Sequence, residues 1–159
     1  MPGSPTGAGD VALEWQDGIV KSLGTLDGSY ESGAYGINNK GDVVGFSLTG
    51  PDRTSPGHAF VYHAGTMTDL GTLPGDTGST ATSINDSGEV VGASDSRAFL
   101  YVNGAMYDLN SLIDPTDPLA AVVRLDGAAS INSEGWIAVN GTDTRTENLQ
   151  RAFLLIPSH

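Results

Sequence analysis

The chain has 159 residues, with 7 Lys and Arg against 19 Asp and Glu, which gives a formal net charge of −12. Such an acidic molecule repels nucleic-acid phosphates and anionic membranes, so we expect no nucleic-acid partner. Cysteine is absent, which excludes disulfides, thiolate catalysis and thiolate metal sites. The 22 glycines and 8 prolines are typical of many short strands joined by turns rather than of long helices.

Residues 1–10 have neither a basic start nor an apolar run, and we predict that they are a disordered linker or a remnant of cloning rather than a signal peptide. Elsewhere the longest apolar stretch is 119–123, which is too short to span a bilayer. We therefore expect no membrane insertion.

One motif recurs at a fixed spacing along the chain. Ile-Asn-Asn-Lys-Gly begins at Ile37 and returns as Ile-Asn-Asp-Ser-Gly at Ile84 and, in degraded form, as Ile-Asn-Ser-Glu-Gly at Ile131. The spacing is 47 residues each time (84 − 37 and 131 − 84). A period of this size indicates one supersecondary unit repeated along the chain. The Asn and Gly of each copy predict a tight hairpin turn, because both tolerate positive φ.

A second recurring hairpin precedes each of these motifs. It opens with Ala-Leu-Glu-Trp at 12–15, Ala-Phe-Val-Tyr at 59–62 and Ala-Phe-Leu-Tyr at 98–101, and one lone strand of this kind lies at 151–155. We therefore predict a single β-repeat domain over 11–156. Its repeats span about 11–57, 58–96 and 97–150, followed by a closing strand at 151–156. Four strands in each repeat and the closing strand give thirteen strands.

The strand patterns predict an all-β fold of repeated four-stranded antiparallel sheets in a β-propeller-like array. Runs such as 59–62 and 98–102 are almost continuously apolar, as expected where both faces of a sheet are covered. Three units are fewer than the roughly four to eight blades of typical propellers, so a β-trefoil or a β-prism is the alternative. The short link between 94 and 98 predicts that each sheet is offset from the sequence repeat by half a unit.

The third unit is irregular. It carries Asp-Pro-Thr-Asp-Pro at 114–118, followed by an apolar segment at 119–125. We interpret this segment as a short helix or an extra strand that caps an exposed sheet edge, as atypical terminal repeats often do.

The second unit carries three blocks in a fixed order, namely His-Ala-Phe-Val-Tyr from His58, Gly-Thr-Met-Thr-Asp-Leu-Gly-Thr-Leu from Gly65 and the Ile-Asn block from Ile84. Together they closely resemble the HAF repeat, which is named for its His-Ala-Phe triplet and described in predicted extracellular bacterial proteins. The resemblance covers nearly all of 11–156, although Val11, Arg97 and Arg151 replace His58 in the other copies. It implies an extracellular or cell-surface repeat domain, and it brings no catalytic residues with it.

Aromatic side chains beside turns are candidates for stacking on sugar rings. Trp136 replaces the acidic residue that the other two copies carry at this position, where we expect exposure to solvent. Tyr107 is the second candidate ligand-binding residue. The further aromatic candidates are Trp15, Tyr30 and Tyr35. The alternative interpretation of all five is cross-strand or core packing.

His58 and Arg53 complete the set of candidate ligand-binding residues. Arg53 lies in the predicted loop 48–57, and loops of this kind on a rigid scaffold commonly hold recognition residues. His58 and His63 are five residues apart on one predicted strand, so their side chains point to opposite faces and do not form a zinc site. The structural interpretation of His58 is a hydrogen bond to a neighbouring segment, with Asp69 as the acceptor.

We predict no metal site, no cofactor and no catalytic residue. Turn residues at 38–42 and 85–89, and Asp114 with Asp117, offer oxygen ligands for calcium, but none has the D-x-[DN]-x-[DN]-G spacing. Glycosidases need two carboxyl groups facing one cleft, one of them with a raised pKa. The G-x-S-x-G motif of serine hydrolases is absent. We therefore expect that the protein is not an enzyme.

These observations favour a non-catalytic extracellular β-repeat module that binds a glycan or a protein surface, or that assembles with copies of itself. Self-association has a physical motive, because an open array exposes unpaired strand edges and one uncovered sheet face. The alternatives are an extracellular polysaccharide hydrolase that uses paired carboxylates and a structural subunit of a surface layer or filament.

Overall fold

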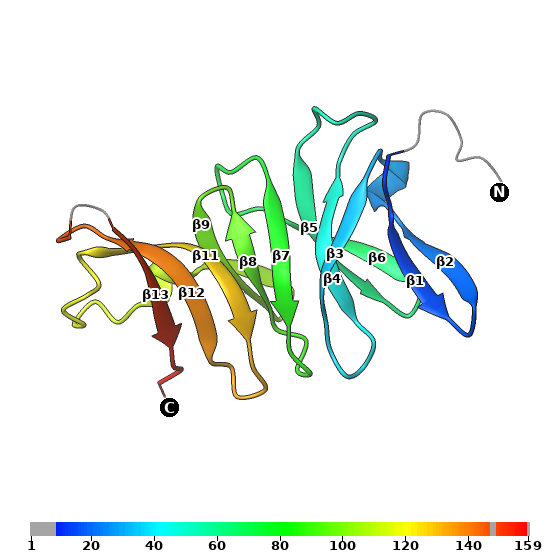
Figure 1. Cartoon of the computed structure of the whole chain (residues 1–159). Coiled ribbons are helices and arrows are strands. Elements are labelled where there is room, and N and C mark those ends of the chain that lie inside the picture. Colours follow the sequence, from blue (N-terminus) through cyan, green and yellow to red (C-terminus); the bar gives the residue numbers. More distant parts are fainter. Residues whose placement is uncertain (1–8, 147–148, 159) are drawn as a thin grey trace.

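The computed structural model describes residues 9–146 and 149–158, which form a row of four antiparallel sheets (Figure 1). The first sheet is a hairpin, β1 (Ala12–Gln16) and β2 (Ile19–Gly24). The second sheet contains β3 (Ser32–Ile37), β4 (Val43–Leu48), β5 (Gly57–His63) and β6 (Thr66–Gly71). The third contains β7 (Ser79–Ile84), β8 (Val90–Ser94), β9 (Arg97–Val102) and β10 (Ala105–Asp108). The fourth contains β11 (Val123–Ile131), β12 (Ile137–Asp143) and β13 (Leu149–Leu155).

The described residues contain the thirteen predicted strands, and they also confirm the offset between sheets and sequence repeats. β3 and β4 flank the first Ile-Asn turn, whereas β5 and β6 form the hairpin that opens the next repeat. β7 and β8 repeat the first strand pair 47 residues later, and β9 and β10 repeat the second pair 39 residues later (105 − 66). The short link from β8 to β9 explains the offset, because it returns the chain antiparallel with Ser94 paired to Arg97.

Two-residue turns close the hairpins between third and fourth strands. Asn103 (φ 54) and Gly104 (φ 81) join β9 to β10, and positive φ at both positions gives the turn twist that antiparallel strands favour. Two short 3₁₀ turns, η1 (Leu26–Gly28) and η2 (Leu109–Leu112), follow β2 and β10.

The Ile-Asn turns use their two defining residues for different purposes. Only the glycine has a positive φ, for example Gly88 at φ 83, so the prediction that the Asn also serves for positive φ is wrong. The Asn side chain instead satisfies the turn. Oδ1 of Asn85 accepts hydrogen bonds from the backbone N–H groups of Ser87 and Glu89, each at 3.0 Å.

The side-chain amides of the same Asn residues tie successive sheets together. Nδ2 of Asn38 donates to the backbone carbonyl of Asn85 at 3.1 Å, and Nδ2 of Asn85 donates to the backbone carbonyl of Asn132 at 3.0 Å. Each bond joins residues 47 positions apart, so the sequence period becomes a contact between sheets. We call this chain of bonds the Asn ladder.

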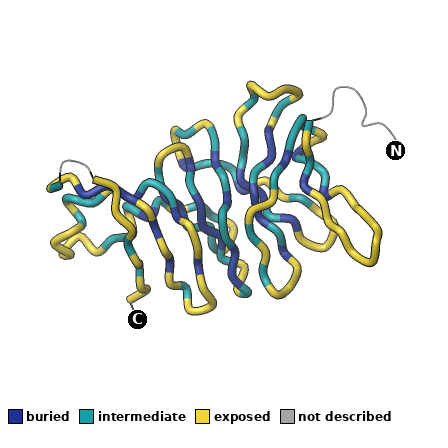
Figure 2. Tube along the Cα trace, in the orientation of Figure 1, coloured by how far each residue is buried: buried dark blue, intermediate teal, exposed yellow. Residues whose placement is uncertain are grey.

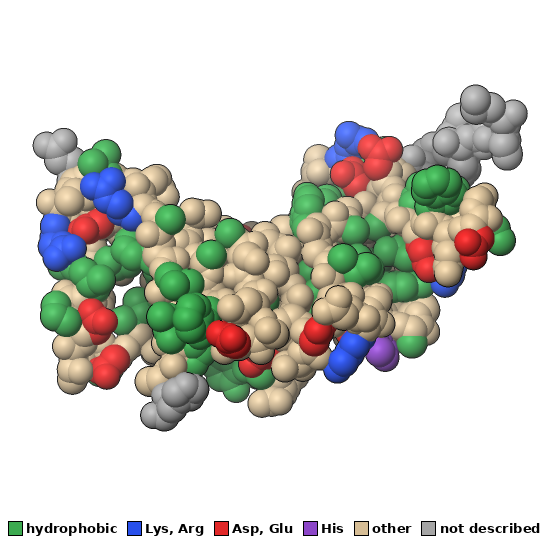
Figure 3. Space-filling view, turned by 60° about the horizontal axis from the view of Figure 1, so that its bottom comes forward, with side chains coloured by type: hydrophobic (Ala, Val, Ile, Leu, Met, Phe, Trp, Pro, Cys, Tyr) green, Lys and Arg blue, Asp and Glu red, His purple; other side chains and the backbone are tan. Residues whose placement is uncertain are grey.

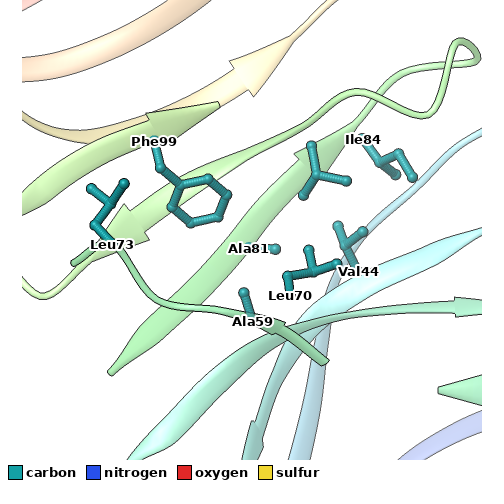
Figure 4. Close-up of a cluster of buried hydrophobic side chains, with 8 residues drawn as sticks. Val44, Ala59, Leu70, Leu73, Ala81, Ile84 and Phe99 are labelled. Carbon is teal, nitrogen blue, oxygen red and sulfur yellow. The ribbon is translucent and has the colours of Figure 1, made fainter. Parts of the chain in front are cut away.

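The first strand of each long sheet packs across the face of the sheet before it. β7 lies against β3, β4 and β5, and β11 lies against β7, β8 and β9. Ala59 and Ala98 are fully buried at the centres of these two interfaces, where a small side chain lets the next strand approach. Figure 4 shows one such interface, with Val44 and Leu70 of the second sheet facing Ile84 of the third. Figure 2 shows that buried residues gather between the sheets.

The fourth sheet departs from the pattern. Residues 114–122 form turns, with neither a helix nor an extra strand, so the predicted cap over 119–125 is wrong. Val123 and the next two residues instead lengthen β11, which has nine residues where β3 and β7 have six. Asp114 and Asp117 explain the turns, because each Oδ1 accepts a backbone N–H two residues later, at 2.8 Å.

The predicted linker over 1–10 is described only in part, because residues 1–8 lie outside the described part of the chain. Gly9 and Asp10 are held against the second sheet. The N–H of Gly9 donates to the carbonyl of Tyr30, and the carbonyl of Asp10 accepts from the N–H of Ser32, both at 3.0 Å.

The row of sheets is open. β1 and β2 lie at one end and β12 and β13 at the other (Figure 1), and the molecule curves into a crescent (Figure 3). The all-β antiparallel fold is confirmed. Among the described residues the strands close neither into a propeller ring nor into the threefold arrangement of a β-trefoil or β-prism. In the same residues, no helix has the length and apolar character needed to cross a membrane.

Candidate functional site

A groove of about 820 Å³ lies between the first hairpin and the second sheet. Leu13 and Trp15 of β1 line one wall, and Tyr35 and Ile37 of β3 line the other. All four are among the exposed large hydrophobic residues of the described chain. We call this site the N-terminal groove. A concentration of exposed apolar side chains around one groove is typical of a binding surface.

The repeat explains why apolar side chains stand in solvent here. Ile37, Ile84 and Ile131 occupy the same place in their sheets, yet their exposed fractions are 68%, 6% and 7%. Ile84 and Ile131 are buried because each packs within a cluster that includes the preceding sheet. The sheet that precedes Ile37 consists of β1 and β2, which correspond to the third and fourth strands of the longer sheets. Ile37 therefore lacks the cover that first and second strands provide elsewhere.

The opposite wall is exposed for a different reason. Leu13 corresponds to Phe60 and Phe99, which are fully buried because each packs against the sheet before its own. In the described chain no sheet precedes β1, and Leu13 is 59% exposed and Trp15 is 77% exposed. β1 pairs with β2 alone, so backbone groups along its other edge face the groove without a strand partner in the described chain. The groove thus offers apolar surface and a strand edge together.

Hydrogen bonds nevertheless hold β1 against β3 in the position that the third strand of a longer sheet takes against the next sheet. The N–H of Ala12 donates to Oγ of Ser32 at 3.0 Å, and that hydroxyl donates to the carbonyl of Gly24 at 2.7 Å. The same two bonds recur 47 residues later among Ala59, Ser79 and Gly71. The groove is therefore a defined part of the repeat geometry.

Two basic side chains and one acidic side chain line the groove. Lys21 and Lys40 are the only lysines of the chain, and both line the groove. Nζ of Lys21 lies 3.8 Å from Glu14 and 5.8 Å from the centre of the Tyr62 ring. In a molecule with a net charge of −12, two ammonium groups at one groove favour a partner that carries acidic side chains.

Asp42 stands where the first Ile-Asn turn ends, beside the groove. Nδ1 of His63 contacts Oδ1 of Asp42, and Nδ2 of Asn38 donates to Oδ2 at 2.8 Å. The hydrogen bond with His63, followed by the bond from Asn38, lowers the pKa of Asp42. This carboxylate therefore stays ionised and serves as a structural acceptor.

Two of the four predicted ligand-binding residues lie far from the groove. Trp136 lies directly before β12 in the fourth sheet, and its N–H donates to Oδ1 of Asn132 at 2.9 Å. Its side chain is exposed, as predicted. Tyr107 is also exposed, on β10 at the edge of the third sheet.

The other two predicted residues come from the second sheet, at the end away from its Ile-Asn turn. Nδ1 of His58 lies 2.9 Å from the carboxylate of Asp69, which confirms the predicted hydrogen bond between β5 and β6. Arg53 lies in the loop between β4 and β5, 5.6 Å from the centre of the Tyr30 ring and 3.8 Å from Glu31. The four predicted residues therefore belong to three different sheets and do not converge on one site.

Two observations on the carboxyl groups of the described residues bear on metal binding and on glycoside hydrolysis. Residues 9–146 and 149–158 contain no group of three or more His, Asp or Glu side chains placed to hold a metal ion. In this part of the chain, each carboxyl pKa that departs clearly from its usual value is lowered, in Asp42, Asp52, Asp76, Asp86, Asp114 and Asp143. Glycosidic general acids need the opposite shift.

Sequence reasoning did not identify Ile37 and Leu13 as site residues, because both follow the apolar pattern of core positions in their repeats. One signal was present in the sequence, since β1 is not preceded by an Ile-Asn motif in the given chain. Comparisons of this chain with protein-family models, with curated proteins and with solved structures found no match.

Proposed function

We propose that this protein is a non-catalytic binding module that takes a β-structured protein segment into its N-terminal groove. The exposure of Ile37, beside the burial of Ile84 and Ile131, carries the proposal. A partner that placed strands against β3 would bury the same kind of surface that β7 and β11 bury within the chain. It would also gain backbone hydrogen bonds along the free edge of β1, the usual basis of strand addition.

The resemblance to the HAF repeat supports the setting of this function. We propose that the protein is extracellular or attached to a cell surface, as that resemblance implies. We also interpret the row of sheets as part of a propeller-like array, because propeller blades are antiparallel four-stranded sheets packed face to face.

A glycan is the second candidate ligand, because Trp15 and Tyr35 both line the groove and present aromatic surface. The neighbouring aliphatic side chains of Leu13 and Ile37 favour a protein segment over a sugar. The lowered carboxyl pKa values argue against the alternative of a polysaccharide hydrolase.

A titration with a strand-pair peptide tests the proposal. The probe is a synthetic peptide of residues 79–94, which spans β7 and β8 and contains no tryptophan. In a Trp136→Phe background, Trp15 is the only tryptophan and reports on the groove. We expect a saturable blue shift of its emission. Ile37→Asp should abolish the shift without unfolding the protein, because the side chain is already exposed.

A peptide carrying Ile84→Asp is the matched control and should not bind. Soluble chitin and β-glucan oligosaccharides are titrated in parallel. If Trp15 emission responds to an oligosaccharide and not to the peptide at about 1 mM, where weak complexes still form, the proposed protein partner is wrong.

A further inference from the structure

The two ends of the crescent carry complementary apolar faces. At the C-terminal end, Ala138 of β12 and Ala152 and Leu154 of β13 are exposed. In the second sheet their counterparts are Val44, Ala59 and Val61, which belong to the cluster that receives β7. The third sheet presents Val91, Ala98 and Leu100 to β11 in the same way. The C-terminal face is therefore built to receive a first strand, and β3 is a first strand without a full sheet before it.

We propose that the C-terminal sheet of one copy of this chain fills the N-terminal groove of a second copy. β11 and β12 then cover β3 of the second copy, and β12 pairs with the free edge of β1. This inference rests on the proposed function of the groove and names its occupant. The chain thus acts as its own partner.

β1 and β13 compete for one place in this joint, because both are third strands. β1 is fixed to β3 through Ser32, as described above. β13 pairs with β12 alone in the described chain, and five of its seven residues are exposed. The joint therefore requires β1 of the second copy to take the place of β13 beside β12, which replaces the seven residue pairs that join β12 and β13 in the single chain.

Strand counting then gives a closed assembly. With β13 released, each copy contributes β1 to β12, and two copies provide 24 strands (2 × 12), enough for six four-stranded sheets. Six lies within the roughly four to eight sheets of typical propellers. The joint is heterologous, so it closes only if the chain curves. The crescent in Figure 3 has both ends raised on the same side, as closure by a second copy requires.

Polar groups at the two ends also match. Within the described residues, Nδ2 of Asn132 has no acceptor, whereas Nδ2 of Asn38 and of Asn85 each reach the next sheet. Across the joint, Asn132 would donate to the carbonyl of Asn38 of the second copy and continue the Asn ladder. Lys40 and Glu134 hold the same turn position in their sheets, so the joint brings opposite charges to neighbouring turns.

Cysteine cross-linking tests the joint, because the chain contains no cysteine of its own. Val44 faces Val61 and Val91 faces Leu100 between second and third strands, so Ala138 should face Glu14 of the second copy. We expect an equimolar mixture of Ala138→Cys and Glu14→Cys chains to form a disulfide-linked dimer on oxidation. Ala138→Cys mixed with Lys21→Cys is the matched control and should not cross-link, since Lys21 lies one strand further out on β2.

Sedimentation measures the size of the assembly. The wild-type chain should form a species of about 33 kDa, twice its 16.3 kDa. Lys40→Glu should weaken each joint about fivefold, as expected for an exposed charge pair. Because the closed dimer has two joints, dimerisation should weaken about 25-fold, and Glu134→Lys in the same chain should restore it.

A stable monomer without the cross-link would overturn this inference, and the peptide titration would still decide the proposed function because it needs no second copy. A dimer that lacks the Ala138–Glu14 cross-link would overturn the assigned joint. Species larger than two copies in sedimentation would overturn the closed ring in favour of a filament.

Discussion

Asn85→Ala should destabilise the protein much more than Asn132→Ala, the same change at the last position of the Asn ladder. The side chain of Asn85 makes four hydrogen bonds and is buried. It accepts from the N–H groups of Ser87 and Glu89, and it donates to the Glu89 carboxylate and to the carbonyl of Asn132. At about 1 kcal/mol for each bond, their loss should lower the free energy of unfolding by about 4 kcal/mol.

Asn132→Ala is the matched control. Oδ1 of Asn132 accepts from the N–H groups of Glu134 and Trp136, and both bonds are exposed. Water can replace the lost acceptor there, so we expect a loss of about 1 kcal/mol or less. Urea unfolding followed by circular dichroism gives both values, at a protein concentration where the chain is monomeric. If Asn85→Ala costs no more than Asn132→Ala, the Asn ladder does not hold the sheets together.

Three further changes probe other parts of the fold. Gly92→Ala should lower the free energy of unfolding by about 3 kcal/mol, because the added Cβ would stand 2.0 Å from the carbonyl oxygen of Thr80. The matched control is Gly127→Ala, whose added Cβ meets only Cβ of Ala93 at 3.5 Å. It should lower the free energy of unfolding much less in the same urea assay. Hydrogen bonds from Arg145 lower the pKa of Asp143 to about 2, so its stabilisation is complete above the unfolded pKa of about 4 and is lost as the pH falls toward 2. Asp143→Asn should therefore flatten the fall in thermal midpoint between about pH 4 and pH 2, and an unchanged pH profile would contradict the assignment. Arg97→His should keep a contact with Asp108, equivalent to the one between His58 and Asp69, and should lose the contact with Asp76. Its thermal midpoint should therefore fall between those of the wild type and Arg97→Met. Equal midpoints for the two variants would show that the Asp108 contact contributes nothing to stability.

Repetition made much of the fold predictable from sequence. The two recurring motifs located the strands to within one or two residues, because each strand pair is bounded by turn residues such as Asn103 and Gly104. The role of the repeated Asn was not predictable. Its hydrogen bond to the next sheet depends on how the sheets stack, and the turn propensity of Asn does not predict the stacking of sheets.

The candidate site was hidden for a related reason. Ile37 and Ile84 have the same local sequence pattern, yet one is exposed and the other buried, because the difference lies in whether two strands cover them. A local sequence pattern predicts that a residue suits a hydrophobic core. It does not show whether other strands of the chain cover that residue. The same limit applies to 119–125, whose apolar residues lengthen β11 where a cap was expected.

Thiol labelling of three single-cysteine variants tests the central claim most directly. Ile37→Cys, Ile84→Cys and Ile131→Cys place a probe at the same repeat position in a chain without other thiols. At a concentration where the chain is monomeric, Ile37→Cys should react with a maleimide at the rate of a free thiol. The other two should react at least about 100-fold more slowly, because their sites open only through local unfolding. Equal rates at all three positions would contradict an open N-terminal groove.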